Sequence, residues 1–416
     1  MLQPIQRGIS LRIGGPDLPD IGAASVDIPE HITDETAIGG GFGPDFRVDP
    51  QVGVGDIVSQ GAALLTDRRD PRITVTAPVA GRVARLDLGP GRRLEQVVLF
   101  HDPDGGRRVF DTTGAGTVEG LRDLLLASGL WTAIQTRPGG RLADPDIAPS
   151  AIFIAAADTR PGAVSPMVGL SADDLTTGIA ALRRMGPVYV IHDGMAAQSD
   201  VTMIRAGAIH PGGLAGWHIH AQHPASATRR VWVMDAPDVA ALGALIRSGH
   251  LPQTRVVAVT GPGLSQARLL RTQAGADLRA LVQGAMTPGP KRILSGSVLD
   301  GVETRHLRHG DRQVTVTLRD TAPTRGHWFR AALSRASRPV PVIPSAAVDQ
   351  ALPATVPAVP FLRALGSGND EAAIALGALS LSEPDLALVD YVTGARPRFA
   401  DLLRGVLDRT GAEQGF

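Results

Sequence analysis

The sequence predicts a multidomain α/β protein with a β-rich module near its N-terminus and helices at its C-terminus. Three observations indicate this fold class. Short strands and turns fill residues 46–99, helical and extended patterns alternate over residues 119–259, and helical spacing dominates after residue 360. The 416 residues are too many for one compact domain, so we expect several.

Residues 46–99 predict a small barrel or sandwich. Arg82 to Asp87 alternates polar and apolar side chains, as a half-buried strand does. Together with Ala77 to Val83 (APVAGRV), this pattern resembles the biotinyl/lipoyl-carrier fold. Such carriers attach their cofactor to a lysine at a hairpin tip, but Asp67 to Pro71 contains arginine and no lysine. Arginine stays protonated and is a poor nucleophile, so we expect a scaffold without carrier function.

The middle of the chain predicts an open, Rossmann-like layer. Ala151 to Ala157 is short and apolar throughout, which is typical of a buried strand. Helices and strands alternate around it, and this alternation favours a parallel sheet. Ser171 is expected to cap a helix, with Asp174 completing a capping box. The expected helices are 121–128, 172–185 and 236–248, and the other expected strands are 187–191 and 255–260.

The rest of the chain predicts two further regions. Short strands around a small helix at 276–284 indicate a compact α+β module. An apolar, Pro-rich stretch at 339–360 precedes helices expected at 361–365, 370–379 and 398–410. We therefore divide the chain into four parts. The first is an N-terminal segment with the barrel (residues 1–105), and the second is the Rossmann-like domain (106–260). The third is the α+β module (261–335), and the last is the Pro-rich and helical region (336–416).

Composition excludes several classes of function. The 41 basic residues balance the 41 acidic ones without a block of like charge, so nucleic acid is not an expected partner. Cysteine is absent, which excludes disulfides, cysteine-ligated iron–sulfur clusters and thiol catalysis. Lys291 is the only lysine, and we expect it at the surface. The uncharged stretch Ile147 to Ala157 is about half the ~20 residues that a membrane-spanning helix needs.

No motif predicts an active site. The chain has neither a nucleophile elbow nor a P-loop. Glycines cluster at 39–43 and at Gly261-Pro262-Gly263, and the second cluster precedes a helix expected at 264–270. It lacks the spacing of a phosphate-binding loop, so both clusters are interpreted as turns. We assign no catalytic residue and leave the cofactor-binding residues unassigned.

Four histidines, His210, His218, His220 and His223, lie close together in the sequence. On an extended strand His218 and His220 would share one face, a spacing that suits a metal. The next carboxylate in the sequence is Asp235, so the other metal ligands would have to come from elsewhere in the chain. The alternative is that these imidazoles hydrogen-bond to turns at a domain junction. We favour this alternative and predict no metal site.

Several colinear stretches resemble the family of A subunits of the sodium-translocating NADH:quinone oxidoreductase, the Nqr complex. The matches extend over most of the chain. They include SGLWTAIQTRP, IFIAAADTRPGAVSP, HPGGLAGWHIH, RVVAVTGPGLSQARLLRTQAGADL, RILSGSVLDG and GSGNDEAAIALGALSLSEPDLALVDYV. Where the family has a Cys-Pro-Gly-Lys-like turn, this chain has Val392 to Arg396 (VTGAR), which makes it a divergent member.

The resemblance implies a lipoyl-like barrel, a Rossmann-like layer, a β-grasp (SLBB-like) module and C-terminal helices. It also implies a cofactor-free subunit, peripheral on the cytoplasmic face of the bacterial inner membrane. In the implied complex NADH is oxidised, electrons pass through FAD, FMN, riboflavin and an iron–sulfur cluster on other subunits, ubiquinone is reduced and Na⁺ is exported. The implied partners are the other subunits, especially a membrane-embedded flavin-bearing one, and a contact with ubiquinone.

The alternative hypothesis is an Rnf-like electron-entry subunit that binds NADH and FMN itself. It would require a glycine-rich flavin loop on the Rossmann-like layer, and we find none. For docking onto membrane partners we expect the Pro-rich residues 339–360 and the C-terminal helices.

Overall fold

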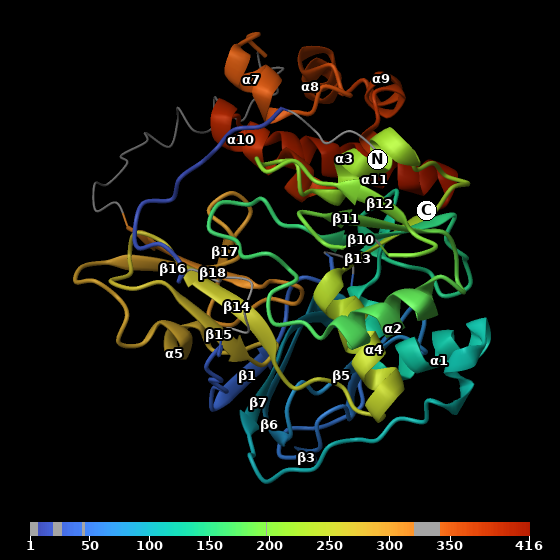
Figure 1. The fold of residues 1–416 in the computed structure, drawn as a ribbon, viewed down its shortest axis with the longest axis vertical. Coiled ribbons are helices and arrows are strands. Elements are labelled where there is room, and N and C mark those ends of the chain that lie inside the picture. Colours follow the sequence, from blue (N-terminus) through green and yellow to red (C-terminus); the bar gives the residue numbers. More distant parts are fainter. Residues whose placement is uncertain (1–6, 20–26, 44–45, 197, 320–341) are drawn as a thin grey trace.

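The computed structural model describes residues 7–19, 27–43, 46–196, 198–319 and 342–416. Its strands form four sheets, and its helices gather in the middle and at the end of the chain (Figure 1). The fold is thus mixed α/β with a β-rich N-terminal part and C-terminal helices, as the sequence predicts.

The N-terminal part is a sandwich of two antiparallel sheets around a common core. Val83 and Leu99 pair across its longest hairpin and are fully buried, as the alternating pattern predicts. The four-stranded sheet has the order β1 (Glu35–Ile38), β7 (Arg93–His101), β6 (Gly81–Gly89) and β3 (Ile57–Val58). The three-stranded sheet consists of β2 (Val48–Pro50), β4 (Ala63–Asp67) and β5 (Thr74–Thr76).

The second part is a six-stranded sheet with helices on both faces. Its order is β12 (Thr202–Arg205), β11 (Val188–His192), β10 (Ala151–Ala156), β13 (Val231–Asp235), β8 (Gln135–Arg137) and β9 (Arg141–Leu142). The four strands β10 to β13 run parallel. One face is covered by α1 (Val118–Ser128), α2 (Ala172–Leu182) and α4 (Ala236–Ser248), and the other by α3 (Ala215–Gln222) (Figure 1).

Local chemistry explains the bounds and the packing of these helices. The Ser171 hydroxyl caps α2 by accepting a hydrogen bond from the Asp174 amide at 3.3 Å, which confirms the predicted N-cap. Gly129 ends α1 in the left-handed conformation (φ 81°). Gly178 of α2 and Gly243 of α4 face backbone carbonyls of the opposite helix, with no room for a Cβ. These glycines let the two helices pack closely against each other.

The third part is a five-stranded sheet with one short helix, α5 (Leu278–Val282). Its order is β15 (Arg268–Thr272), β14 (Arg255–Thr260), β18 (Gln313–Leu318), β16 (Lys291–Ser295) and β17 (Val302–Glu303). The strand expected at 255–260 is present, but it pairs with β15 and β18 and not with the six-stranded sheet. The helix expected at 264–270 is wrong, because this segment is a turn leading into β15. Gly261 (φ 119°) lies in that turn.

The C-terminal part is a helical cluster packed on α3. Its helices are α7 (Ala346–Ala351), α8 (Ala358–Ser367), α9 (Asp370–Ala375), α10 (Ala387–Thr393) and α11 (Phe399–Gln414). They share a core with Trp217 of α3, which is fully buried. The three expected helical segments lie largely within α8, α9 and α11, whereas α7 and α10 were not predicted. Residues 339–341 of the Pro-rich stretch lie outside the described residues.

Candidate functional site

The strand order of the six-stranded sheet reverses at β10. From β10 the chain passes through α2 to β11 on one side, and β13 lies parallel to β10 on the other side. In sheets of this kind, ligands bind in the crevice outside the carboxyl ends of the strands that flank the reversal. The candidate site is therefore the crevice beyond β10 and β13.

Ion pairs line this crevice. Asp158 follows β10 and accepts hydrogen bonds from the Arg160 guanidinium, at 3.0 Å from Nε and 2.6 Å from Nη2. Nη1 of Arg160 donates to Asp300, in the third part of the chain, at 3.2 Å. Arg312 places its Nη2 3.9 Å from Asp158 and 3.7 Å from Asp235, which ends β13. We call these five residues the crevice network.

Burial and charge oppose each other within the crevice network. Burial alone would raise the pKa of Asp158, but the attraction of Arg160 and Arg312 is stronger and holds this pKa below its ordinary value. Burial likewise opposes the charge of Asp300, whose pKa is nevertheless lowered, chiefly by Arg160. For Asp235 the effect of burial is the larger one and raises the pKa, because the attraction of Arg312 offsets only part of the burial effect. In the network the arginines thus neutralise the charges of the aspartates, and no single residue stands out as a general acid or base.

The loop after β10 is packed tightly around its first glycine. A phosphate cradle needs glycines whose open backbone can approach the anion. Gly162 is the first glycine after β10, and the chain itself encloses it. A Cβ on it would lie 2.6 Å from Ile13 Cδ1, 2.8 Å from Thr260 Oγ1 and 3.0 Å from Gln313 Nε2. Gly162 therefore offers no open backbone for an anion to approach.

The structure separates His218 from His220. The expectation that they share one face of a strand is wrong, because both lie on α3. Residues two apart on a helix point in nearly opposite directions. The His218 Nε2 lies 2.7 Å from the Gly212 carbonyl, and the His220 ring lies against the backbone of Gly377. Burial lowers the pKa of both histidines.

The other two histidines of this stretch also have separate partners. His210 Nδ1 lies 3.3 Å from the hydroxyl of Thr159, next to the crevice network. Burial lowers the pKa of His210 to about 4. His223 Nε2 lies 3.0 Å from the hydroxyl of Ser150. The structure thus gives the four histidines separate neighbours: His218 contacts a backbone carbonyl, whereas His210 and His223 contact side-chain hydroxyls.

Within the described ranges, one group of three possible metal ligands exists, which the sequence did not predict. It joins Glu35 of β1 to Asp277 and His306 of the third part. His306 Nε2 lies 2.9 Å from Glu35 Oε1, and the Arg305 guanidinium reaches Glu35 at 2.7 Å and Asp277 at 3.3 Å. The arginine supplies the positive charge that a metal would bring. We interpret the group as an ion-pair link between the barrel and the third part.

The hairpin tip and the lone lysine behave as structural elements. The tip between β4 and β5 is held against the second part, because Arg72 binds Asp70 at 2.6 Å and Asp146 at 2.8 Å. Lys291 lies on β16 and donates to the carbonyl of Pro288 at 2.7 Å. Arg72 and Lys291 are therefore both engaged in contacts within the chain.

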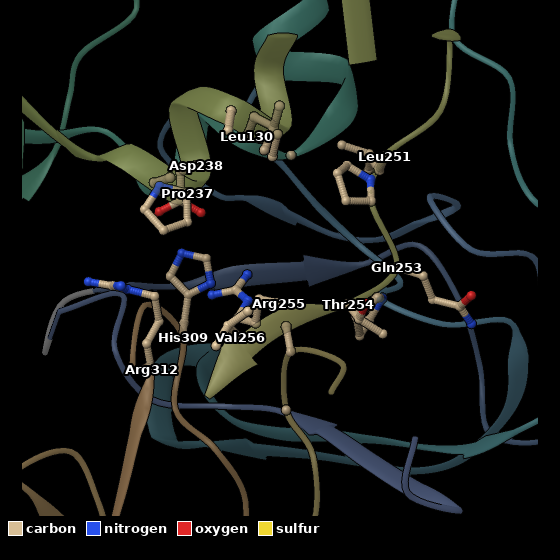
Figure 2. A pocket seen from close by; sticks show the side chains of 18 of the residues that line it. Leu130, Pro237, Asp238, Leu251, Gln253, Thr254, Arg255, Val256, His309 and Arg312 are labelled. Atoms are coloured by element: carbon tan, nitrogen blue, oxygen red, sulfur yellow. The ribbon is translucent and has the colours of Figure 1, made fainter. Parts of the chain in front are cut away.

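A cavity of about 330 Å³ lies where the first three parts meet. Figure 2 shows Arg255, His309 and Arg312 below the first turn of α4, where Pro237 and Asp238 lie. His309 stacks on Phe42 of the barrel with ring centroids 4.4 Å apart. Sequence reasoning did not single out this cavity, because its lining residues are far apart in the chain.

The fold and the site define a class of protein. It is a multidomain α/β chain that joins a barrel sandwich to a largely parallel six-stranded sheet with an ion-pair network beyond the carboxyl ends of its strands.

Comparisons with known proteins agree with this class. Three family models match: the NqrA N-terminal barrel-sandwich hybrid domain over residues 4–102, the NqrA second alpha/beta domain over 117–251, and the NQRA C-terminal (SLBB) domain over 256–306. The chain belongs to the NqrA family, the A subunits of the Na⁺-translocating NADH-quinone reductase.

Curated relatives carry the name of this family. The one from Pseudomonas aeruginosa (strain UCBPP-PA14) is 34% identical, and the match covers 98% of this chain and 99% of the relative. The one from Saccharophagus degradans is 33% identical, and the match covers 87% of this chain and 90% of the relative. A chain of a solved NAD⁺-reducing [NiFe]-hydrogenase is 17% identical, and the match covers 71% of this chain and 64% of the hydrogenase chain. Its TM-score of 0.37 is too low to carry an argument.

Proposed function

We propose that this chain is a cytoplasmic, peripheral subunit of a Na⁺-translocating NADH:ubiquinone oxidoreductase, and that it binds no redox cofactor itself. In this proposal NADH, FAD, FMN, riboflavin and the iron–sulfur cluster belong to other subunits. The relatives from the NqrA family support it. The observation that carries it is the Asp158–Arg160–Asp300 ion-pair chain across the crevice of the six-stranded sheet.

The ion-pair chain argues against the electron-entry alternative. An Rnf-like subunit that binds NADH and FMN would use the crevice beyond β10 and β13. A ligand that displaced Arg160 would leave Asp158 and Asp300 without their main counter-charge, which costs several kcal/mol. The chain also has no cysteine that could ligate an iron–sulfur cluster. Electron transfer through this chain's own groups is therefore not part of the proposal.

The attachment to the membrane is proposed to run through partner subunits. Over the described residues, every helix is too short or too polar to cross a bilayer. We propose the C-terminal helices as the surface that docks on a membrane-embedded, flavin-bearing subunit. Ile343 before α7 and Tyr391 on α10 expose 76% and 59% of their surface, respectively, as an interface requires. A contact between this chain and ubiquinone is part of the proposal, with no residue assigned; the names of the relatives support a quinone as the electron acceptor of the complex.

The four-part division at residues 1–105, 106–260, 261–335 and 336–416 is part of the proposal, as are the Rossmann-like and β-grasp descriptions of the second and third parts. The placement of β14 in the third sheet favours a second boundary close to residue 254.

The test is a titration of the purified, full-length chain with NADH and with FMN, followed by fluorescence and absorption. We expect a colourless protein that shows no saturable binding of either ligand. A protein purified with stoichiometric flavin, or one that binds NADH at micromolar concentrations, would favour the electron-entry alternative.

A further inference from the structure

The cavity between the first three parts contains a buried guanidinium whose Nε has no hydrogen-bond partner among the described residues. Arg312 is nine-tenths buried, and its Nε has no partner in the described chain. Its closest carboxylates, Asp235 and Asp158, lie 3.7 and 3.9 Å from Nη2, beyond hydrogen-bond distance. A buried polar group in this state indicates that something else completes its hydrogen bonds.

A second arginine, Arg255, lies in the same cavity. The half-buried Arg255 side chain enters the cavity beside His309, and no hydrogen bond or ion pair to a described residue involves its guanidinium (Figure 2). His309 contributes no charge of its own near neutral pH, because burial lowers its pKa to about 4. Arg255 and Arg312 thus converge on one space from neighbouring strands, β14 and the start of β18.

The first turn of α4 adds a positive end to this space. Pro237 and Asp238 of that turn line the cavity, and the 13-residue helix receives no side-chain cap from Asp235. The free N–H groups at such a helix end attract anions. Asp238 opposes this attraction, because its carboxylate also lines the cavity and pairs with no described cation.

The remaining walls are largely apolar. Leu130, Leu251, Phe42 and Ala240 belong to them, so the cavity combines convergent cationic donors with a hydrophobic surface.

We propose that this cavity binds a small amphiphilic anion, with its oxyanion group held by Arg255 and Arg312 and its aliphatic or aromatic body against Leu130 and Leu251. The shared chemistry is an organic phosphate or carboxylate. Two guanidiniums suit a doubly charged phosphate better than a singly charged carboxylate. This site is independent of the proposed place in the reductase complex, since binding is measured on the isolated chain.

The test is isothermal titration calorimetry of the full chain with n-hexyl phosphate, n-hexanoate, inorganic phosphate and n-hexanol. We expect saturable binding of hexyl phosphate at one site per chain. Inorganic phosphate and hexanoate should bind at least about tenfold more weakly, the first for lack of apolar contacts and the second for lack of charge. Hexanol should show no saturable binding. Equal affinity for hexanol and hexyl phosphate, or no saturable binding of hexyl phosphate, would overturn the proposal.

Substitutions localise the site. Arg255→Gln should weaken hexyl phosphate binding by about tenfold or more, because a charge-assisted hydrogen bond is lost. Asp238→Asn should strengthen it severalfold by removing a repulsive charge, an effect that misfolding cannot imitate. Arg279→Gln, on the exposed surface of α5, is the matched control with the same charge change. If Arg255→Gln and Arg279→Gln bind equally well, or Asp238→Asn weakens binding, the proposal fails.

Discussion

Asp158 and Arg160 stand two residues apart at the carboxyl end of β10 and form a two-point ion pair, with oxygen–nitrogen distances of 2.6 and 3.0 Å. The aspartate side chain is 9% exposed and the arginine side chain 21%. The same arginine reaches Asp300 of the third part. One guanidinium thus joins the second and third parts of the chain at the crevice of the six-stranded sheet.

Replacing Arg160 should destabilise the protein strongly. Arg160→Ala leaves Asp158 and Asp300 buried without their main counter-charge, and we expect the free energy of unfolding to fall by about 3 kcal/mol or more. Urea denaturation followed by circular dichroism measures this loss. Arg68→Ala is the control, because its exposed pair with Asp49 should contribute less than about 1 kcal/mol. Similar losses in both variants would show that the crevice network is not a structural centre.

His210 should make stability depend on pH. Its pKa is lowered by burial to about 4 in the folded chain, against about 6.5 when unfolded. The folded chain therefore binds fewer protons at this position between the two values. Its contribution to stability is complete above pH ~6.5 and is lost as the pH falls towards 4.

From neutral pH to pH ~5 this single histidine should cost about 2 kcal/mol of stability. His210→Gln should remove that part of the slope, and His31→Gln, at an exposed position, serves as the matched control. The measurement is the denaturation midpoint at a series of pH values. An unchanged slope in His210→Gln would contradict the assignment of a buried, neutral imidazole.

Gly216→Ala should loosen the C-terminal helices. Gly216 lies in the first turn of α3, and a Cβ there would collide with the carboxylate of Asp385, which accepts a hydrogen bond from the Gly216 amide. We expect a loss of about 2 kcal/mol and faster proteolytic release of a C-terminal fragment. Limited trypsin digestion with mass spectrometry checks this. Gly194→Ala, where a Cβ would meet nothing within 4 Å, should digest like the parent protein.

Deletion of the residues after Pro360 should release the chain from membranes, if the C-terminal helices form the docking surface. The deletion also exposes Trp217, so circular dichroism is needed to show that the rest of the chain keeps its fold. Tyr391→Glu tests the same surface without removing any core residue, because Tyr391 is exposed on α10. Immunoblots of membrane and soluble fractions give the readout. Normal membrane levels of both variants would count against this docking surface.

The sequence predicted single elements better than it predicted their partners. The helix at 236–248 and the strand at 255–260 have the expected bounds, because their periodicity and end residues are local signals. That strand nevertheless joins the third sheet, since periodicity contains no information about which strand lies beside it. His218 and His220 were placed on a strand because a short apolar segment fits either structure, and contacts of Trp217 and Ile219 with two different cores select the helix.

The crevice network shows the same limit at the candidate site. Asp158 and Arg160 directly follow a buried strand, a position that could have marked them as site residues. Asp300 and Arg312, however, are more than a hundred residues away in the chain. Only the folded arrangement of two sheets brings them into contact.

The most direct test of the central claim is affinity purification of the tagged chain from detergent-solubilised membranes of its host, with mass spectrometry of the partners and an absorption spectrum of the chain after separation. We predict that membrane-embedded, flavin-bearing subunits are recovered and that the separated chain is colourless. A chain recovered without such partners, or one that retains flavin absorption after separation, would contradict the account.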